Sequence, residues 1–371
     1  MPNRRFRRSA SVAVACSALV GCASNPTILF DSAGSVLDAG AGEETILFAT
    51  VRAAAADSQM VFGAARSQEM SYGAVTVRIP PQREPGDISY PSDRVNPARD
   101  FIASRIDFLS SGDALKASVE ARLADRPLRD RSVSLFVHGY NTDFAEGVFL
   151  NAQMVHDFRA PGVPVHFSWA SAGVPQGYLY DLESANIARD DLAATIRMLE
   201  GTSASDVILV AHSMGAMVLM EALREIGLEG DQDTLSRIST VVLAAPDIDI
   251  DVFEEQLAAI EPRPFPLLVF VSRRDPALRV SSRLRGRAPR VGDGSAIDRL
   301  AGLGVDVVDL TDIEGSRRDE HTKFASSPFV INMIRQAETV RASLDAAPED
   351  PIALLDAVNP GAAQVAVIAA E

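Results

Sequence analysis

The sequence predicts an α/β fold in which a mostly parallel central sheet is flanked by helices on both faces. From residue 132 onward, short apolar runs alternate with longer stretches of helical periodicity, which is typical of repeated strand–helix crossovers. The apolar runs are continuous, which indicates strands that are buried on both faces. A hydrophobic content of 47% with 23% charged residues fits a globular chain with a large core.

The repeated pattern divides the chain into elements and places them in one domain over residues 46–345. The catalytic core is predicted at 132–345, and residues 46–131 form an N-terminal extension that adds strands to the edge of the sheet. The expected strands are Ile46–Val51, Ala74–Ile79, Val133–Val137, Val163–Trp169, Asp206–Ala211, Thr240–Ala245, Pro266–Ser272 and Val305–Leu310. The expected helices are Asp143–Phe158, Ser184–Leu199, Met214–Ile226, Asp251–Ile260 and one more after Ser327.

The first residues have the pattern of an export signal. Four arginines between positions 4 and 8 precede the apolar run Ser9–Val20, which is too short to span a bilayer in the mature protein. The run 19–22, Leu-Val-Gly-Cys, resembles the lipobox of bacterial lipoproteins. That resemblance implies removal of residues 1–21 and attachment of diacylglycerol to Cys22, and Ala23 after it implies the outer membrane, facing the periplasm. Residues 22–45 are predicted to be a flexible tether and residues 346–371 a mobile tail.

The net charge of −15 makes nucleic acid and anionic lipid headgroups unfavourable electrostatic partners for the chain as a whole. Contact with a membrane is therefore predicted through the acyl chains on Cys22 alone. Cys16 is lost with the signal, so no disulfide is expected. The sequence has no Cys-x-x-Cys or His-Glu-x-x-His motif and no glycine-rich phosphate loop, which favours a mechanism without metal or cofactor. Nothing in the pattern indicates an oligomeric state.

The segment 207–215, Val-Ile-Leu-Val-Ala-His-Ser-Met-Gly, places Ser213 between a buried strand and a helix. This is the setting of a nucleophile elbow, in which a tight turn exposes the serine hydroxyl and requires small residues two positions away on each side. Ala211 and Gly215 occupy those positions, with Ala211 where glycine is usual. Ser213 is the predicted nucleophile.

A serine nucleophile needs a base, and the chain has five histidines at 138, 156, 166, 212 and 321. The first four fall in a strand end, a helix, a strand and the elbow itself. His321 follows the nucleophile in a polar loop beyond the last strand, as the chain order serine, acid, histidine requires. His321 is the predicted base.

Two carboxylates could orient that base. Asp275 and Asp247 each follow a strand between Ser213 and His321, where a carboxylate can accept the imidazole N–H. Asp275 is favoured because it follows the strand that most often carries the acid in this kind of fold, and Asp247 remains the alternative.

The oxyanion that forms during acyl transfer needs two backbone donors. One is expected from Met214, directly after the nucleophile. The other is expected from Tyr140 in the run 138–141, His-Gly-Tyr-Asn, where Gly139 allows the backbone to approach closely. His138 and Asn141 are predicted to hold this loop in place.

These motifs resemble a bacterial group of α/β-hydrolases of the esterase and lipase superfamily. The resemblance rests on five segments, which are 138–141, 167–173, 177–181, 211–215 and 245–247. It implies an α/β-hydrolase fold and hydrolysis of a carboxylic ester by a Ser-Asp-His triad, often in exported lipoproteins. Members often have glycine before the base histidine, whereas this chain has Glu320.

Three alternatives stay open. The same residues would serve an amidase, a thioesterase or an acyltransferase, and a small ester or acyl compound is the expected substrate class. A non-catalytic binding lipoprotein could also retain this scaffold. Residues 170–182, with Pro175, Tyr178 and Tyr180, are predicted either to cap the site or to form a surface loop.

Overall fold

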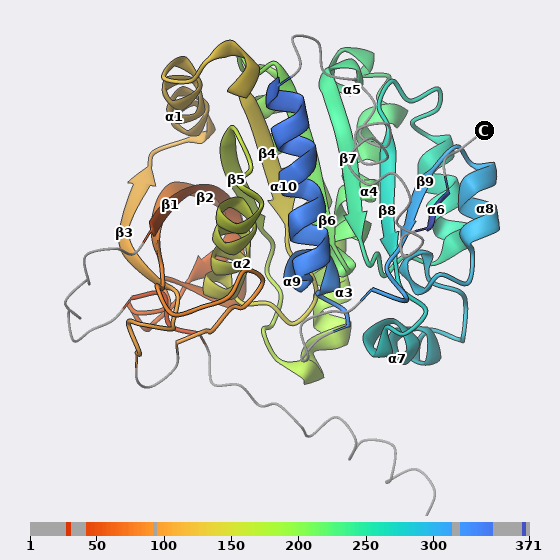
Figure 1. Ribbon diagram of the computed structural model, residues 1–371, viewed down its shortest axis with the longest axis horizontal. Coiled ribbons are helices and arrows are strands. Elements are labelled where there is room, and N and C mark those ends of the chain that lie inside the picture. The colour runs from red at the N-terminus through yellow and green to blue at the C-terminus, as the bar shows by residue number, and fades with distance from the viewer. Residues whose placement is uncertain (1–26, 31–41, 92–94, 314–319, 344–365, 369–371) are drawn as a thin grey trace, which may run out of the picture.

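A single sheet organises the molecule, which we describe from a computed structural model over residues 27–30, 42–91, 95–313, 320–343 and 366–368. Its strands lie in the order β10-β9-β8-β7-β6-β4-β5-β1-β2-β3 (Figure 1). They are β1 (Gly42–Ala54), β2 (Phe62–Ile79), β3 (Ile102–Leu109), β4 (Ser132–Val137), β5 (Val163–Ser168), β6 (Asp206–His212), β7 (Ile238–Ala244), β8 (Leu267–Val271), β9 (Asp306–Asp309) and β10 (Ala366–Ile368).

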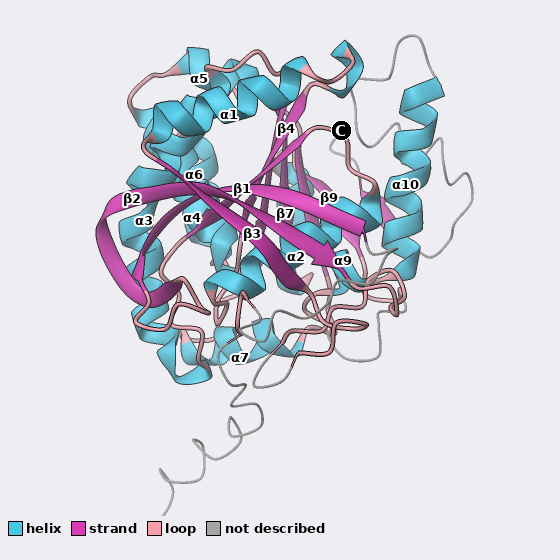
Figure 2. Ribbon diagram, turned by 90° about the vertical axis from the view of Figure 1, so that its left-hand side faces the viewer, coloured by secondary structure: helices cyan, strands magenta, loops and turns pink. Residues whose placement is uncertain are grey.

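The centre of the sheet is parallel and its margins are antiparallel. All neighbouring strands from β1 through β5, β4, β6, β7 and β8 to β9 pair in parallel. The pairs β1–β2, β2–β3 and β9–β10 are antiparallel. Figure 2 shows how strongly the strands β1 to β3 are twisted relative to the parallel strands.

Helices cover both faces of the sheet. They are α1 (Gly112–Ala124), α2 (Phe144–Phe158), α3 (Tyr178–Glu200), α4 (Met214–Leu228), α5 (Gln232–Arg237), α6 (Ile250–Ala258), α7 (Pro276–Leu284), α8 (Ile297–Gly302), α9 (Lys323–Ser326) and α10 (Pro328–Ser343). Apolar side chains of α1, α3, α4, α6 and α8 form one core with one face of the sheet. Those of α2, α9 and α10 pack on the other face. The predicted mostly parallel sheet with helices on both faces is confirmed.

Local sequence signals set the helix ends near the site. Asp143 and Glu146 form a capping box at the start of α2, each side chain bonding the other's backbone N–H. Asp275 caps α7, and Pro276 occupies its first turn, where no N–H is needed. These signals fix where the loops that follow β4 and β8 end.

Parts of the structure differ from the sequence-based expectation. β3 and α1 lie in the predicted N-terminal extension, but neither was predicted. α1 buries only Leu115, Val119 and Leu123, which gives it a narrow apolar face and a weak periodic signal. α3 begins at Tyr178, earlier than the predicted start at Ser184.

Two segments predicted to be mobile contain ordered residues. Within the predicted tether, Leu29 is fully buried, and its backbone bonds Gln59 and Ala103. Within the predicted tail, β10 pairs with β9. Both ordered stretches are short apolar runs, Ile28–Phe30 and Ala366–Ile368, which gain stability by burial or by strand pairing. The predicted signal segment, Cys22 and most of the tether and tail lie outside the described residues.

Candidate active site

Ser213 stands at a sharp turn between β6 and α4. Its backbone has φ 54° and ψ −121°, a conformation that side-chain-bearing residues rarely adopt and that costs about 1–3 kcal/mol. The turn is tight because a Cβ on Gly215 would lie 2.2 Å from the carbonyl oxygen of His138. Ala211, the other small neighbour, is fully buried. The chain therefore forms the strained strand–turn–helix arrangement of a nucleophile elbow around Ser213.

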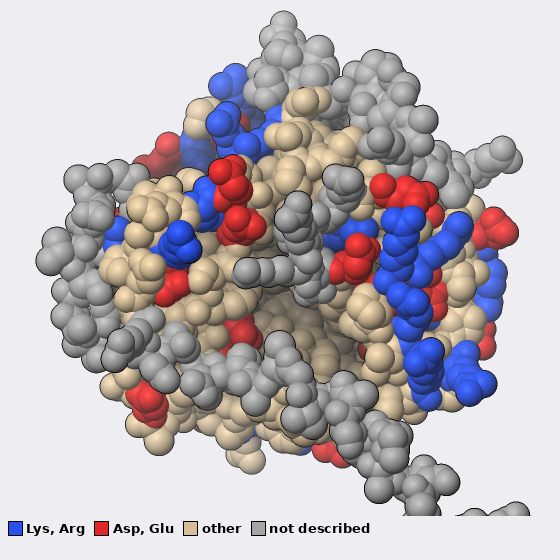
Figure 3. All heavy atoms as spheres, turned by 60° about the horizontal axis from the view of Figure 1, so that its bottom comes forward, with Lys and Arg blue, Asp and Glu red and all other residues tan. Residues whose placement is uncertain are grey.

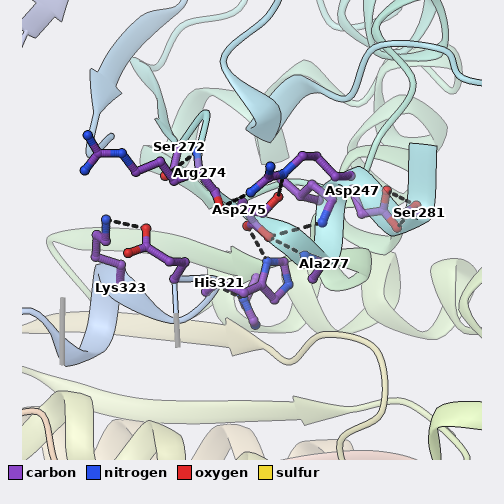
Figure 4. Close-up of polar contacts among 12 residues, drawn as sticks. Asp247, Ser272, Arg274, Asp275, Ala277, Ser281, His321 and Lys323 are labelled. Carbon is purple, nitrogen blue, oxygen red and sulfur yellow. Dashed lines mark hydrogen bonds and ion pairs between the residues drawn. The ribbon is translucent and has the colours of Figure 1, made fainter. Parts of the chain in front are cut away.

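His321 and Asp275 are joined by a direct hydrogen bond. Nδ1 of His321 lies 2.6 Å from Oδ2 of Asp275, and Oδ1 of Asp275 accepts the backbone N–H groups of Ala277 and Leu278 at 2.8 and 3.1 Å (Figure 4). Burial favours the neutral acid, but these three donors outweigh it and lower the pKa of Asp275 below its ordinary value. The ionised carboxylate can only accept, so Nδ1 of His321 donates and Nε2 is the nitrogen that can act as a base.

Asp247 is occupied by other partners. Both of its carboxylate oxygens contact Oγ of Ser281, at 2.6 and 2.8 Å, and Tyr178 donates to it at 3.3 Å. The buried guanidinium of Arg290 lies 3.5 Å away. In Figure 4, Asp247 points toward Ser281 and Asp275 toward His321. Of the two acids left open by the sequence, the structure brings Asp275 to the histidine and uses Asp247 to tie α7 to its neighbours.

His212 links His321 to the turn at Ser213. Its ring lies 4.7 Å from the ring of His321, and its Nε2 lies 3.2 Å from the carbonyl oxygen of His321. Burial, with the nearby ring of His321, lowers the pKa of His212 to about 3, so His212 is neutral and Nε2–H donates to that carbonyl. Because His212 directly precedes Ser213, this bond holds His321 beside the elbow. The sequence pattern excluded His212 as the base but did not show this role.

The residues around His321 are held by a second charged pair. Nζ of the buried Lys323 lies 2.5 Å from Glu320 and donates to the carbonyl of Leu310 at 3.1 Å. Lys323 therefore ties Glu320, the residue before His321, to the chain just after β9.

The predicted oxyanion loop lies directly against the nucleophile. A Cβ on Gly139 would lie 2.9 Å from Cβ of Ser213 and 3.0 Å from Nδ1 of His212, so only glycine fits there without displacement. Met214 is the first residue of α4, and the N–H groups of a first helical turn have no intrahelical acceptor. Tyr140 and Met214 thus lie on the two sides of Ser213 from which donors are expected.

His138 orients the peptide that carries the Tyr140 N–H. Its Nδ1 lies 2.9 Å from the carbonyl oxygen of Gly139, while its Nε2 lies 3.4 Å from Oγ of Ser168 and 3.1 Å from the carbonyl of Trp169. Burial, together with the charge of Arg52, lowers the pKa of His138 well below its ordinary value, so the ring is neutral. With the proton on Nδ1, the ring donates to the Gly139 oxygen and Nε2 can accept from Oγ of Ser168. In a trans peptide the C=O and N–H point in opposite directions, so fixing the Gly139 oxygen directs the Tyr140 N–H away from His138.

Arg52 binds the loop that carries Tyr140. Sequence reasoning did not single out this arginine. Its Nε donates to Oγ of Ser168 at 2.9 Å, and its terminal nitrogens donate to the carbonyls of Thr142, Ser171 and Gly63 at 2.7, 2.8 and 3.1 Å. Burial lowers its pKa to about 10, so it stays charged at neutral pH. A single cation on β1 thereby joins the loops after β4 and β5. The sequence signal was an arginine directly after the predicted strand Ile46–Val51.

Residues 170–182 contact the oxyanion loop instead of standing apart from it. Asp181, fully buried, accepts from Ser171, Ala172 and Asn141 at 2.6, 2.6 and 3.2 Å. The hydroxyl of Tyr140 donates to the carbonyl of Pro175, and the rings of Tyr140 and Tyr178 meet edge to face with centroids 5.3 Å apart. This segment, rather than a detached surface loop, forms one wall beside Tyr140.

Two absences apply to the described ranges only. No three His, Cys, Asp or Glu side chains within them lie together in a way that could hold a metal ion. None of the helices described combines the length and apolar composition that a membrane span requires.

Comparison with known proteins places the chain in a family. Structures similar to it include lipase B of Aspergillus fumigatus, with 17% identity, a TM-score of 0.38 and coverage of 61% of this chain, so that the chain spans about half (55%) of the lipase. Another is a Rhizomucor miehei esterase, with 14% identity, a TM-score of 0.33 and coverage of 86% of this chain and 85% of the esterase. No functionally curated protein matches the sequence. Residues 112–338 match the family described as "Alpha/beta hydrolase of unknown function (DUF900)", and the chain belongs to this α/β-hydrolase family.

Proposed function

We propose that this protein is a serine hydrolase that cleaves carboxylic esters through an acyl-enzyme on Ser213. The single observation that carries the proposal is the 2.6 Å bond between His321 and Asp275, formed beside a strained elbow that presents Ser213. A serine, a histidine and an ionised carboxylate in this arrangement form the constellation of acyl-transfer enzymes.

In the acylation step, Oγ of Ser213 attacks the ester carbonyl carbon while its proton passes to Nε2 of His321. Asp275 holds the imidazole in the correct tautomer and stabilises the imidazolium. The N–H groups of Tyr140 and Met214 bind the oxyanion, each contributing roughly 3 kcal/mol to transition-state stabilisation. The intermediate then expels the alkoxide, which takes the proton from His321 and leaves as an alcohol.

Deacylation repeats these steps with water. His321 takes one proton from the water as its oxygen attacks the acyl carbon, and the same proton returns to Oγ of Ser213 when the carboxylic acid leaves. No step requires a metal or a cofactor.

A fluorophosphonate probe tests the proposal directly. We expect covalent labelling of the wild type, no labelling of Ser213→Ala, and turnover of p-nitrophenyl acetate by the wild type alone. Absence of labelling in the folded wild type would instead support a non-catalytic binding protein. Faster turnover of acyl thioesters than of matched oxygen esters would indicate a thioesterase, and transfer to an added alcohol in preference to water would indicate an acyltransferase.

We further propose that the chain is exported and anchored in a membrane by diacylglycerol on Cys22, facing the periplasm. The support is the signal-like start and the lipobox-like run 19–22. Mass spectrometry of the N-terminal peptide should detect the lipid on Cys22, and Cys22→Ser should release the protein from the membrane fraction. An unmodified cysteine in the membrane-bound protein would contradict the anchor.

A further inference from the structure

Positive charge is concentrated in one segment of this acidic chain. Residues 273–290 contain seven arginines and a single acidic residue, Asp275, whereas the whole chain has a net charge of −15. The net charge argues against anionic partners for the chain as a whole. A local field depends on how charges are distributed, so this segment must be considered separately.

The segment contains α7, whose outward face combines arginines with apolar side chains. Leu278 and Ser281 point inward and are buried. Val280 and Leu284, four residues apart and therefore on the same face of the helix, are 39% and 60% exposed. Arg283, on the exposed side of the same helix, is next to them. An apolar stripe bordered by cations is the pattern of a helix that lies in a membrane interface.

The helix also lies at the edge of the candidate active site. α7 begins at its N-cap Asp275, the partner of His321. Oγ of Ser281 on α7 lies 2.9 Å from the hydroxyl of Tyr178, at the start of α3, and the neighbouring Leu179 is 74% exposed. In Figure 3, Lys and Arg side chains gather in a band on the right of the face that carries α7, and the middle of this face is hollowed.

We propose that the exposed face of α7, formed by Arg279, Val280, Arg283 and Leu284, together with Arg287 in the turn that follows, binds the surface of an anionic phospholipid bilayer. The arginines pair with lipid phosphates while the two apolar side chains enter the headgroup boundary. Nucleic acid would match the charge but not the exposed valine and leucine, which sit between cations and offer no stacking surface. The face would hold the opening of the site against the bilayer.

Vesicle flotation of the full chain carrying Cys22→Ser tests this without the proposed lipid anchor. We expect binding to vesicles of phosphatidylglycerol in phosphatidylcholine, and little to phosphatidylcholine alone. Arg283→Gln with Arg287→Gln should lower the partition coefficient about fivefold for each arginine. Val280→Ser with Leu284→Ser should lower it about tenfold, since their apolar area no longer leaves water.

Matched controls separate this face from general surface effects. Arg129→Gln with Arg189→Gln removes arginines elsewhere whose side chains are 70% and 40% accessible. Leu128→Ser with Leu228→Ser removes exposed leucines that are 74% and 64% accessible. These four changes should leave flotation unchanged. Failure of the wild type to bind, equal binding to both lipids, or binding unaffected by Val280→Ser with Leu284→Ser would each overturn the proposal.

The inference goes beyond the proposed hydrolysis, and the two can fail separately. Ser213→Ala should float like the wild type, and Arg283→Gln with Arg287→Gln should hydrolyse a soluble ester at the wild-type rate. Absence of hydrolysis in a wild-type protein that floats normally would contradict only the proposed function. Binding of single-stranded DNA by a protein that does not float with anionic vesicles would overturn the proposal and indicate a nucleic-acid partner instead.

Discussion

Asp275 divides its two carboxylate oxygens between the base and the helix that follows. Oδ2 bonds Nδ1 of His321 at 2.6 Å, while Oδ1 caps α7 through the N–H groups of Ala277 and Leu278. The cap fixes the orientation of the carboxylate, and the carboxylate in turn orients the imidazole of His321. The same residue therefore caps α7 and orients His321.

Substitution of the two aspartates should have opposite consequences. Asp275→Asn should lower kcat/KM for p-nitrophenyl acetate about 10,000-fold, because an amide stabilises the wrong imidazole tautomer. Asp247→Asn should retain most activity but lower the free energy of unfolding by about 3 kcal/mol, since the buried Arg290 loses its counter-charge. Steady-state kinetics and urea unfolding measure the two effects. An inactive Asp247→Asn beside an active Asp275→Asn would assign the acid to Asp247.

The link from Arg52 through Ser168 to His138 should act on turnover rather than on substrate binding. Ser168→Ala removes the hydroxyl between Arg52 and His138, and we expect kcat to fall about tenfold with KM little changed, as for other groups that orient a site residue indirectly. Arg52→Met should reduce kcat further and destabilise the fold by about 3 kcal/mol, because four acceptors, two of them buried, lose their donor.

Ser205→Ala serves as the matched control for Ser168→Ala, because Ser205 is an exposed serine whose hydroxyl bonds Asp206 and Arg131. Its kinetics should equal those of the wild type. Measurements well below the unfolding temperature separate misorientation from unfolding. A change in KM alone for Ser168→Ala would contradict a role in placing the oxyanion loop.

Features of the fold and site could be predicted from the sequence where the signal lies within a few neighbouring residues. The elbow could be predicted because Ala211, Ser213 and Gly215 meet the steric requirement of the turn within five residues. The parallel strands could be predicted because strands that are buried on both faces have continuous apolar runs. β3 lies at a sheet edge and exposes residues such as Phe108, 62% accessible, so its pattern is ambiguous.

Other features depend on contacts between distant residues, which no local pattern encodes. The choice between Asp275 and Asp247 required the bond to His321, 46 residues away. Arg52 contacts carbonyls about 90 to 119 residues away, so its role emerges only when β1 pairs with β5. The apolar run 28–30, Ile-Leu-Phe, is too short to predict an element, and the contacts of Leu29 with Gln59 and Ala103 arise only in the folded chain.

Glu200 should make stability depend on pH. It lies at the end of α3 with both carboxylate oxygens buried and without a hydrogen bond, and burial raises its pKa to about 8. Between pH 4.5 and about 8 the unfolded chain releases this proton while the folded chain retains it, so the stability contribution of the neutral form is lost as pH rises. Glu200→Gln should therefore stabilise the protein by about 1–3 kcal/mol at pH 8.

The difference between Glu200→Gln and the wild type should vanish near pH 4, where both states carry the proton. Thermal unfolding from pH 4 to 8 measures this window. The exposed Glu69 is the control, and Glu69→Gln should show no such pH dependence. A stabilisation by Glu200→Gln that is constant with pH would mean that ionisation of Glu200 is not its cause.

Three glycine-to-alanine changes should separate catalysis from stability at the elbow. In Gly139→Ala the new methyl group would meet Ser213 Cβ at 2.9 Å, so we expect kcat to fall at least tenfold with a modest loss of stability. In Gly215→Ala it would meet backbone oxygens of His138 and Val137 at 2.2 and 2.7 Å, so we expect destabilisation of about 3 kcal/mol. The contacts at Gly215 are much closer than those at Gly139, which explains why we expect the larger loss of stability there.

Gly302, in α8, provides the comparison, since a Cβ there meets nothing within 4 Å. Gly302→Ala should leave kcat unchanged and raise stability by about 0.5–1 kcal/mol through helix propensity. Chemical denaturation with parallel ester kinetics tests all three variants. Full activity in Gly139→Ala would mean that the loop can retreat from Ser213, which would remove the steric basis for placing Tyr140 at the oxyanion.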